Sequence, residues 1–128
     1  MKELKFRVWD TIKCKMNKLQ GMAFDTQSYI PSALKLPGLS WRPIEEFELL
    51  QWVCLSDNSG VNVYEGDYIK ISSIIYKVVW NETLLSFELQ ELKGSLNRSI
   101  IDVSLGDIVG NKFENYNKYH IELDKTTI

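Results

Sequence analysis

The sequence predicts a mainly β fold, a small barrel preceded by an N-terminal β-hairpin and containing at most short helical turns. Apolar and polar residues alternate in several short runs, and clusters of turn-forming residues separate these runs. Aromatic residues make up 12% of the chain, and their wide rings suit pleated surfaces. The length of 128 residues, of which 45% are hydrophobic, is enough for one domain with a real core. Closing a sheet of such short strands into a barrel removes its exposed edges.

The first expected element is the N-terminal hairpin. Residues 4–9 alternate between apolar and basic side chains, Asp10 and Thr11 suit a turn, and residues 15–20 repeat the alternation. Gly21 is expected to end or bend the second strand. Residues 26–41 are rich in Ser, Pro and Gly and are interpreted as one long loop, which is functional, mobile or held by a partner.

The middle of the chain is expected to contain a helical turn, a strand and two bends. Pro43 at a first helical position, followed by Glu45 and Glu46 in the first turn, indicates a short helix. Residues 49–55 alternate as a strand does, and Asp57-Asn-Ser-Gly60 then reverses the chain. Gly66 allows a second bend.

The C-terminal half predicts an antiparallel meander. Its strands are residues 68–71, 75–80 and 84–90, joined at Ser72-Ser73 and Asn81-Glu82 by links too short for parallel neighbours. Two further short strands are expected at 100–103 and 108–110, and the polar tail from 115 is expected to fray. Residues 1–48 would then hold the hairpin, the loop and the helical turn. Residues 49–128 would form the barrel and tail. The two parts together are expected to form one compact unit.

Composition disfavours several classes of function. A net charge of −2 lacks the basic excess of a nucleic-acid-binding protein, and no apolar run approaches the ~20 residues that span a bilayer. Charged residues near the start argue against a secretory signal, and Cys14 and Cys54 lie far apart, so a reducing cytoplasm is expected. The one histidine, His120, lies in the tail, which disfavours a catalytic triad.

No metal or cofactor is expected. Glu65 and Asp67 would share a strand face and could hold Mg²⁺ together with waters, but a solvated turn is the favoured interpretation. The scattered glycines do not form a phosphate-binding loop. A non-enzymatic role is therefore expected.

Partner binding receives more support because the chain has four tryptophans, and tryptophan often anchors interfaces. Trp41, in the expected loop beside Arg42, is the best exposed anchor. The full set of partner-binding candidates is Trp9, Trp41, Arg42, Tyr64, Glu65 and Asp67. An alternative set for nucleic acid is the basic hairpin with Lys5, Arg7, Lys13 and Lys15, aided by the ring of Trp9.

Several blocks, in this order and spacing, resemble the YopX family of small phage and prophage proteins. They are KFRVWD (5–10), LLQWVCLSDNSG (49–60), VYEGDYI (63–69), YKVVW (76–80) and IVGNKFEN (108–115). The chain departs from the family pattern at Trp52-Val53-Cys54, where the family has Tyr-Thr-Gly, and so lacks the glycine expected at that turn. The resemblance implies a barrel similar to SH3-type barrels, carriage by phages or prophages, and no established activity.

These observations together predict a non-enzymatic phage or prophage accessory protein in the cytoplasm of its bacterial host. It is expected to act as a protein-binding or self-associating module, either as a homo-oligomer or with a host or phage protein. The alternative is a weak nucleic-acid-binding protein that uses the basic hairpin.

Overall fold

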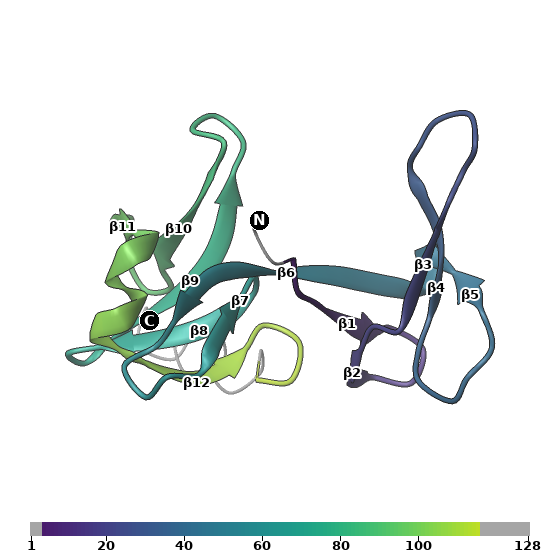
Figure 1. Cartoon of the computed structure of the whole chain (residues 1–128). Coiled ribbons are helices and arrows are strands. Elements are labelled where there is room, and N and C mark those ends of the chain that lie inside the picture. The colour runs from purple at the N-terminus through teal and green to yellow at the C-terminus, as the bar shows by residue number, and fades with distance from the viewer. Residues whose placement is uncertain (1–3, 116–128) are drawn as a thin grey trace. The chain divides into compact units, whose positions relative to one another are not determined.

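The computed structural model describes residues 4–115 and confirms a mainly β fold (Figure 1). All strand pairs are antiparallel, and two short 3₁₀ helices accompany the strands in the described part of the chain. The described residues divide into two compact units, 4–51 and 52–115, which we call the N-terminal unit and the C-terminal unit. Within residues 4–115 there is no helix of the length and apolarity needed to cross a membrane.

The expected hairpin opens the N-terminal unit. Strands β1 (Phe6–Asp10) and β2 (Lys15–Lys18) pair with each other, and β1 also pairs with the first half of β6 (Phe47–Ser56). The carboxylate of Asp10 closes the β1–β2 turn by accepting hydrogen bonds from the N–H groups of Ile12 and Lys13, at 3.0 and 3.1 Å. Asp10 is thus both the end of a strand and a turn former.

The interpretation of residues 26–41 as one long loop is wrong. Strands β3 (Gly21–Phe24), β4 (Pro31–Lys35) and β5 (Arg42–Pro43) form a three-stranded sheet in the order β3-β4-β5, and Gly21 begins a strand rather than ending one. Leu34 and Leu36 are buried in a core with Val8 and Phe47. Apolar burial therefore outweighs the Ser-, Pro- and Gly-rich composition of this segment. Pro31 stands at the first position of its strand, where a missing N–H is tolerated.

The expected helical turn followed by a strand is present. Helix η1 (Ile44–Glu46) is a single 3₁₀ turn preceded by Pro43, and β6 follows it directly. The pairing of β6 with β7 (Asn62–Tyr64) shifts register between Trp52 and Ser56, where Cys54 has a φ of 67°. Cys54 thus adopts the left-handed backbone conformation that favours glycine, so the chain makes this turn without a glycine.

The C-terminal unit contains the predicted meander. Strands β8 (Asp67–Ile71), β9 (Ile74–Asn81) and β10 (Ser86–Glu91) are consecutive neighbours in a curled five-stranded sheet that forms a half-barrel. Strands β11 (Asn97–Ser99) and β12 (Asp107–Asn111) complete this sheet, in the order β11-β10-β9-β8-β12. Its buried core comprises Val53, Val63, Ile69, Ile71, Tyr76, Val78, Leu89 and Val103.

The strand expected at residues 100–103 is a helix instead. Helix η2 (Ile100–Leu105) is 3₁₀, with Val103 buried and Ile100 packed against the core, while Ile101 and Leu105 are exposed. Burial at a spacing of three residues matches the three-residue turn of this helix. The prediction for residues 108–110 is confirmed by β12, whereas the expectations for His120 and the tail beyond 115 lie outside the described residues.

Candidate protein-binding surface

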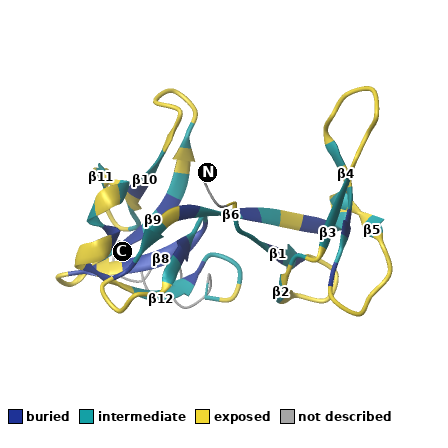
Figure 2. Cartoon of the chain, viewed as in Figure 1, coloured by how far each residue is buried: buried dark blue, intermediate teal, exposed yellow. Residues whose placement is uncertain are grey.

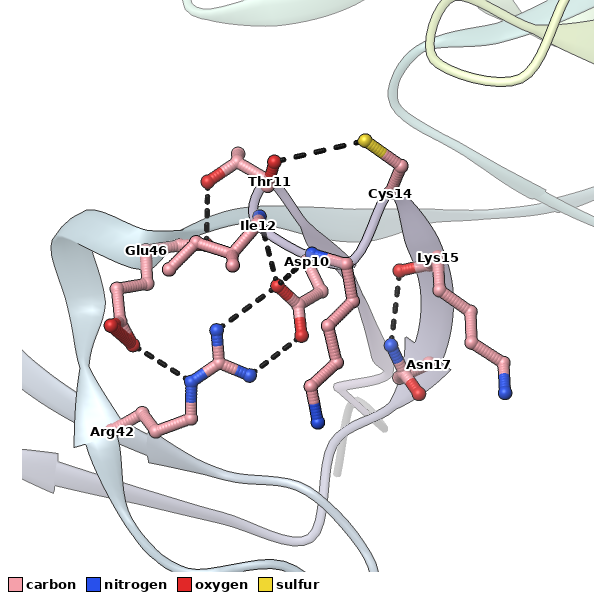
Figure 3. Close-up of polar contacts among 9 residues, drawn as sticks. Asp10, Thr11, Ile12, Cys14, Lys15, Asn17, Arg42 and Glu46 are labelled. Atoms are coloured by element: carbon pink, nitrogen blue, oxygen red, sulfur yellow. Dashed lines mark hydrogen bonds and ion pairs between the residues drawn. The ribbon is translucent and has the colours of Figure 1, made fainter.

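Arg42, a partner-binding candidate from the sequence, forms an ion-pair network inside the N-terminal unit (Figure 3). Its Nη1 and Nη2 donate to the two carboxylate oxygens of Asp10 at 2.6 and 3.0 Å, and its Nε donates to Glu46 Oε2 at 2.7 Å. The guanidinium also lies 4.6 Å from the ring centre of Phe47. These bonds engage the guanidinium within the unit, so its evident role is to join the β1–β2 turn to η1.

This network keeps the Asp10 carboxyl ionised. The guanidinium of Arg42, helped by the backbone N–H groups of Lys13 and Ile12, lowers the pKa of the buried Asp10 carboxyl to about 2. Figure 3 shows Arg42 held between Asp10 and Glu46. Loss of either partner would leave an uncompensated charge, and the paired groups leave little for a ligand to neutralise.

The second group of candidates forms a closed turn in the C-terminal unit. Asp67 is buried, and its Oδ2 accepts a hydrogen bond from the N–H of Tyr64 at 2.8 Å, across Gly66 with its φ of 88°. Tyr64 and Glu65 are half-buried. No group of three or more His, Cys, Asp or Glu side chains suited to a metal occurs between residues 4 and 115.

The basic candidates are divided between the two faces of the β1–β2 hairpin. Arg7 lies opposite Lys18, whereas Lys15 lies opposite Asp10. Side chains of directly paired residues share a face and successive residues alternate, so Arg7 and Trp9 lie on one face and Lys15 on the other. Lys13 is in the connecting turn, and Lys5 precedes β1. The hairpin therefore does not gather these charges into one patch.

Trp41 is the one aromatic candidate that is largely in solvent, with 50% of its surface exposed. Its ring lies over Gly21 at the start of β3, where an added Cβ would come within 3.0 Å of ring carbon Cη2. β3 is the outermost strand of its sheet, and its four residues, Gly-Met-Ala-Phe, include no charge and no proline. Its outer backbone groups are therefore open to pairing with another strand.

The tip of the β3–β4 hairpin extends this exposed region. Phe24, Tyr29 and Ile30 are 55%, 80% and 62% exposed, and the connection between the two strands is exposed throughout (Figure 2). The carboxylate of Asp25 accepts hydrogen bonds at 2.9 Å from the N–H groups of Gln27 and Ser28, which lowers its pKa. Asp25 also exchanges backbone hydrogen bonds with Tyr29 and Ile30. The tip is therefore a defined turn that holds large apolar side chains in water.

We call Gly21–Phe24, Tyr29, Ile30 and Trp41 together the β3 surface. Other outer strands carry the features that protect sheet edges: lysines in β2, Arg-Pro in β5, Arg98 in β11 and Asp107 in β12, while β7 has only three residues. The β3 surface lacks such protection. Of its residues only Trp41 was singled out from the sequence. The signal that could have revealed the others is the pair of short apolar runs flanking Asp25-Thr-Gln-Ser28.

Comparison with known proteins identifies a family and a similar solved structure. The family model described as YopX protein matches residues 5–118. The crystal structure of protein EF1440 from Enterococcus faecalis is similar in fold, with a TM-score of 0.65 and 19% sequence identity, covering 92% of this chain and 99% of that one. No curated protein matches the chain.

Proposed function

The chain belongs to the YopX family, as its sequence blocks indicated, and on this premise we propose that it is a non-enzymatic phage or prophage accessory protein that self-associates through the β3 surface. It acts in the cytoplasm of the bacterial host. The observation that carries the proposal is an outer strand without charge or proline beside three exposed apolar side chains at a fixed turn.

A second copy suits this surface because two β3 strands can satisfy each other. In an antiparallel pair related by a two-fold axis, the outer N–H and C=O groups of each strand meet those of the other. The pair brings the Gly21 end of one strand beside the Phe24 end of the other. Trp41, which lies over Gly21, then covers Phe24 of the second copy, and both side chains lose water contact.

The test is the solution mass measured by light scattering during size-exclusion chromatography, at low and moderate salt. The wild-type chain is expected at twice 14.9 kDa. Ala23→Lys places a charge on the open edge and Tyr29→Asn removes an apolar contact, and each is expected to shift the mass to that of a monomer. Leu105→Lys, at an exposed site in η2, is the matched control and should leave the dimer intact.

A wild-type chain that stays monomeric at both salts contradicts self-association, and the search for a binding partner then moves to a host or phage protein. An equal loss of the dimer in Leu105→Lys would also contradict the role of β3. Far-ultraviolet circular dichroism of each variant separates loss of association from loss of folding.

The nucleic-acid alternative has narrower support, since Arg7 and Lys18 share a face with Trp9 but Lys15 does not. Fluorescence anisotropy with single- and double-stranded oligonucleotides tests it. A steep loss of binding with rising salt would favour it, because phosphate contacts release counterions. No binding at low salt would exclude the nucleic-acid alternative.

A further inference from the structure

Two lysines of the C-terminal unit, Lys77 in β9 and Lys112 just after β12, lie near each other on the face of the sheet opposite its core. Lys77 pairs directly with Tyr68 of β8, which pairs in turn with Gly110 of β12, so these three residues share one face. The next residue of β8, Ile69, belongs to the buried core on the other face. We call Lys77 and Lys112 the lysine pair.

Gly66 connects the backbones that carry the two lysines. Its N–H donates to the carbonyl of Val78, the residue after Lys77, and its carbonyl accepts from the N–H of Lys112, both at 2.9 Å. The stem of Lys112 lies over Gly66, where an added Cβ would be 3.4 Å from its Cε and 3.5 Å from its Cγ. Its Nζ lies 4.9 Å from the ring centre of Phe113. The glycine thus leaves room for the lysine stem to cross a position that is bonded to both strands.

The two ammonium groups repel each other and have no acidic partner among residues 4–115. Both lysines are half-buried. Burial and, after it, the charge of Lys112 lower the pKa of the Lys77 amine. Neither lysine forms an ion pair within the described part of the chain, and this includes pairs with Glu65 and Glu114, the acids nearest to Gly66 and Lys112 in sequence. The lysine pair is therefore a concentration of positive charge that the described chain does not neutralise.

Other acidic side chains of the neighbouring strands are engaged elsewhere. Asp67 lies on the core face, where its Oδ2 accepts a hydrogen bond from the N–H of Tyr64 at 2.8 Å. Asp107 Oδ1 accepts a hydrogen bond from the hydroxyl of Ser59 at 2.8 Å. Glu88 Oε1 accepts hydrogen bonds from two asparagine side chains, at 3.0 and 3.1 Å. A soluble anion is thus the group that can balance the lysine pair.

We propose that the lysine pair binds a phosphate group with two negative charges, either inorganic phosphate or a phosphate monoester. Lysine binds phosphate as a point charge, and two lysines match the charge of a dianion. A carboxylate or the phosphodiester of a nucleic-acid backbone carries one charge and would neutralise half of the pair. Gln90 is exposed and lies directly opposite Lys77 in β10, so its side-chain amide can donate a further hydrogen bond. This inference goes beyond the proposed self-association and uses none of the β3 surface.

The test is nuclear magnetic resonance of the full chain titrated with inorganic phosphate, with chloride keeping the ionic strength constant. At about pH 8 phosphate is largely a dianion, and we expect saturable shifts of the backbone amides of Gly66, Lys77 and Lys112. Lys77→Met and Lys112→Met each keep an apolar stem and should weaken binding at least about tenfold, because each removes a charged hydrogen bond. Lys70→Met is the matched control. It changes an exposed lysine on the same face of β8 and should bind phosphate as the wild type does.

Two phosphate esters distinguish the sources of the group. Methyl phosphate keeps two charges, so binding as tight as that of inorganic phosphate would assign the site to a ligand with a phosphate monoester. Markedly weaker binding of methyl phosphate would assign it to free phosphate. Dimethyl phosphate carries one charge and should bind at least about tenfold more weakly than inorganic phosphate.

Three results would overturn the proposal. One is the absence of any saturable shift with inorganic phosphate, and another is equal affinity of the wild type and either methionine variant. The third is binding of dimethyl phosphate as tight as that of inorganic phosphate, because the pair would then not select a dianion. Circular dichroism checks the folding of each variant, and the two methionine variants test the site independently. Ala23→Lys should still bind phosphate, so failure of self-association and failure of phosphate binding can be told apart.

Discussion

Asp10 shows how one carboxylate organises a set of contacts across the N-terminal unit. It accepts two backbone hydrogen bonds from its own turn and two from Arg42, which in turn holds Glu46. Thr11 adds backbone and hydroxyl hydrogen bonds to the carbonyl of Glu46, at 3.0 and 2.8 Å. Because Asp10 is buried, its charge depends on these donors.

We expect Arg42→Met to lower the free energy of unfolding by about 3 kcal/mol, because it leaves the buried Asp10 carboxylate without its partner. Urea denaturation monitored by tryptophan fluorescence measures this loss. Arg98→Met is the control, since it breaks a more exposed pair with Asp102 and should cost less than about 1 kcal/mol. Equal losses in the two variants would contradict the structural role of Arg42.

Lowering the pH should reduce the free energy of unfolding, because the Asp10 carboxyl becomes protonated. The folded chain keeps the pKa of Asp10 at about 2, below its ordinary value of 3.8, so the unfolded chain takes up the proton first as pH falls. The stability that Asp10 contributes is complete above the ordinary pKa. It is lost as pH falls from about 4 to about 2, amounting to about 2 kcal/mol. Urea denaturation across this range should show a smaller decline in Asp10→Asn than in the wild type, and an unchanged decline would exclude this assignment.

The elements show where sequence patterns suffice and where they do not. The meander and its turns could be predicted because alternation and turn residues act locally, as at Ser72-Ser73, where φ values of 56° and 105° make a two-residue link between β8 and β9. β4 was missed because burial of Leu34 depends on Val8 and Phe47, which are distant in sequence. η2 was missed because Ile100-Ile-Asp-Val103 fits both a strand and a three-residue helical period.

In the candidate site, too, some features follow from residue type and others depend on tertiary contacts. Trp41 could be singled out from its residue type, but its exposure and its position over Gly21 depend on the pairing of β3 with β4 and of β4 with β5. Arg42 looked equally available in the sequence, yet a partner 32 residues away, Asp10, engages it. Residue type thus indicates what a side chain can do, and tertiary pairing decides whether it is free to do it.

The register shift between β6 and β7 includes Cys54, whose backbone conformation permits a prediction about the stability of the chain. Cys54 is exposed and has a φ of 67°, a conformation that costs a residue with a Cβ about 1 kcal/mol or more. Cys54→Gly should therefore raise the free energy of unfolding by up to about 1 kcal/mol, partly offset by the greater freedom of glycine in the unfolded chain. Cys54→Ala removes the thiol but keeps the Cβ and should leave stability nearly unchanged. A gain in both variants, measured in urea, would point to the thiol and not to the backbone.

At the scale of the whole molecule, residues 4–115 contain two apolar cores. Val8, Leu34, Leu36 and Phe47 form one within residues 4–51, and the other lies entirely within residues 52–115. Buried apolar contacts set the free energy of local opening, so each core should govern the backbone protection of its own unit. The chain passes from one unit to the next within β6, and the bulge at Cys54 interrupts the β6–β7 ladder just beyond that point.

We expect two matched core truncations to act on different parts of the chain. Leu34→Ala and Leu89→Ala each remove a fully buried leucine side chain and should each cost about 2–5 kcal/mol within its own unit. In hydrogen exchange measured by mass spectrometry, Leu34→Ala should raise exchange in β1, β3 and β4 and leave β8, β9 and β10 protected. Leu89→Ala should do the reverse. If either truncation raised exchange equally in both sets of strands, the chain would unfold as one cooperative body, and the separation of the cores would have no energetic consequence.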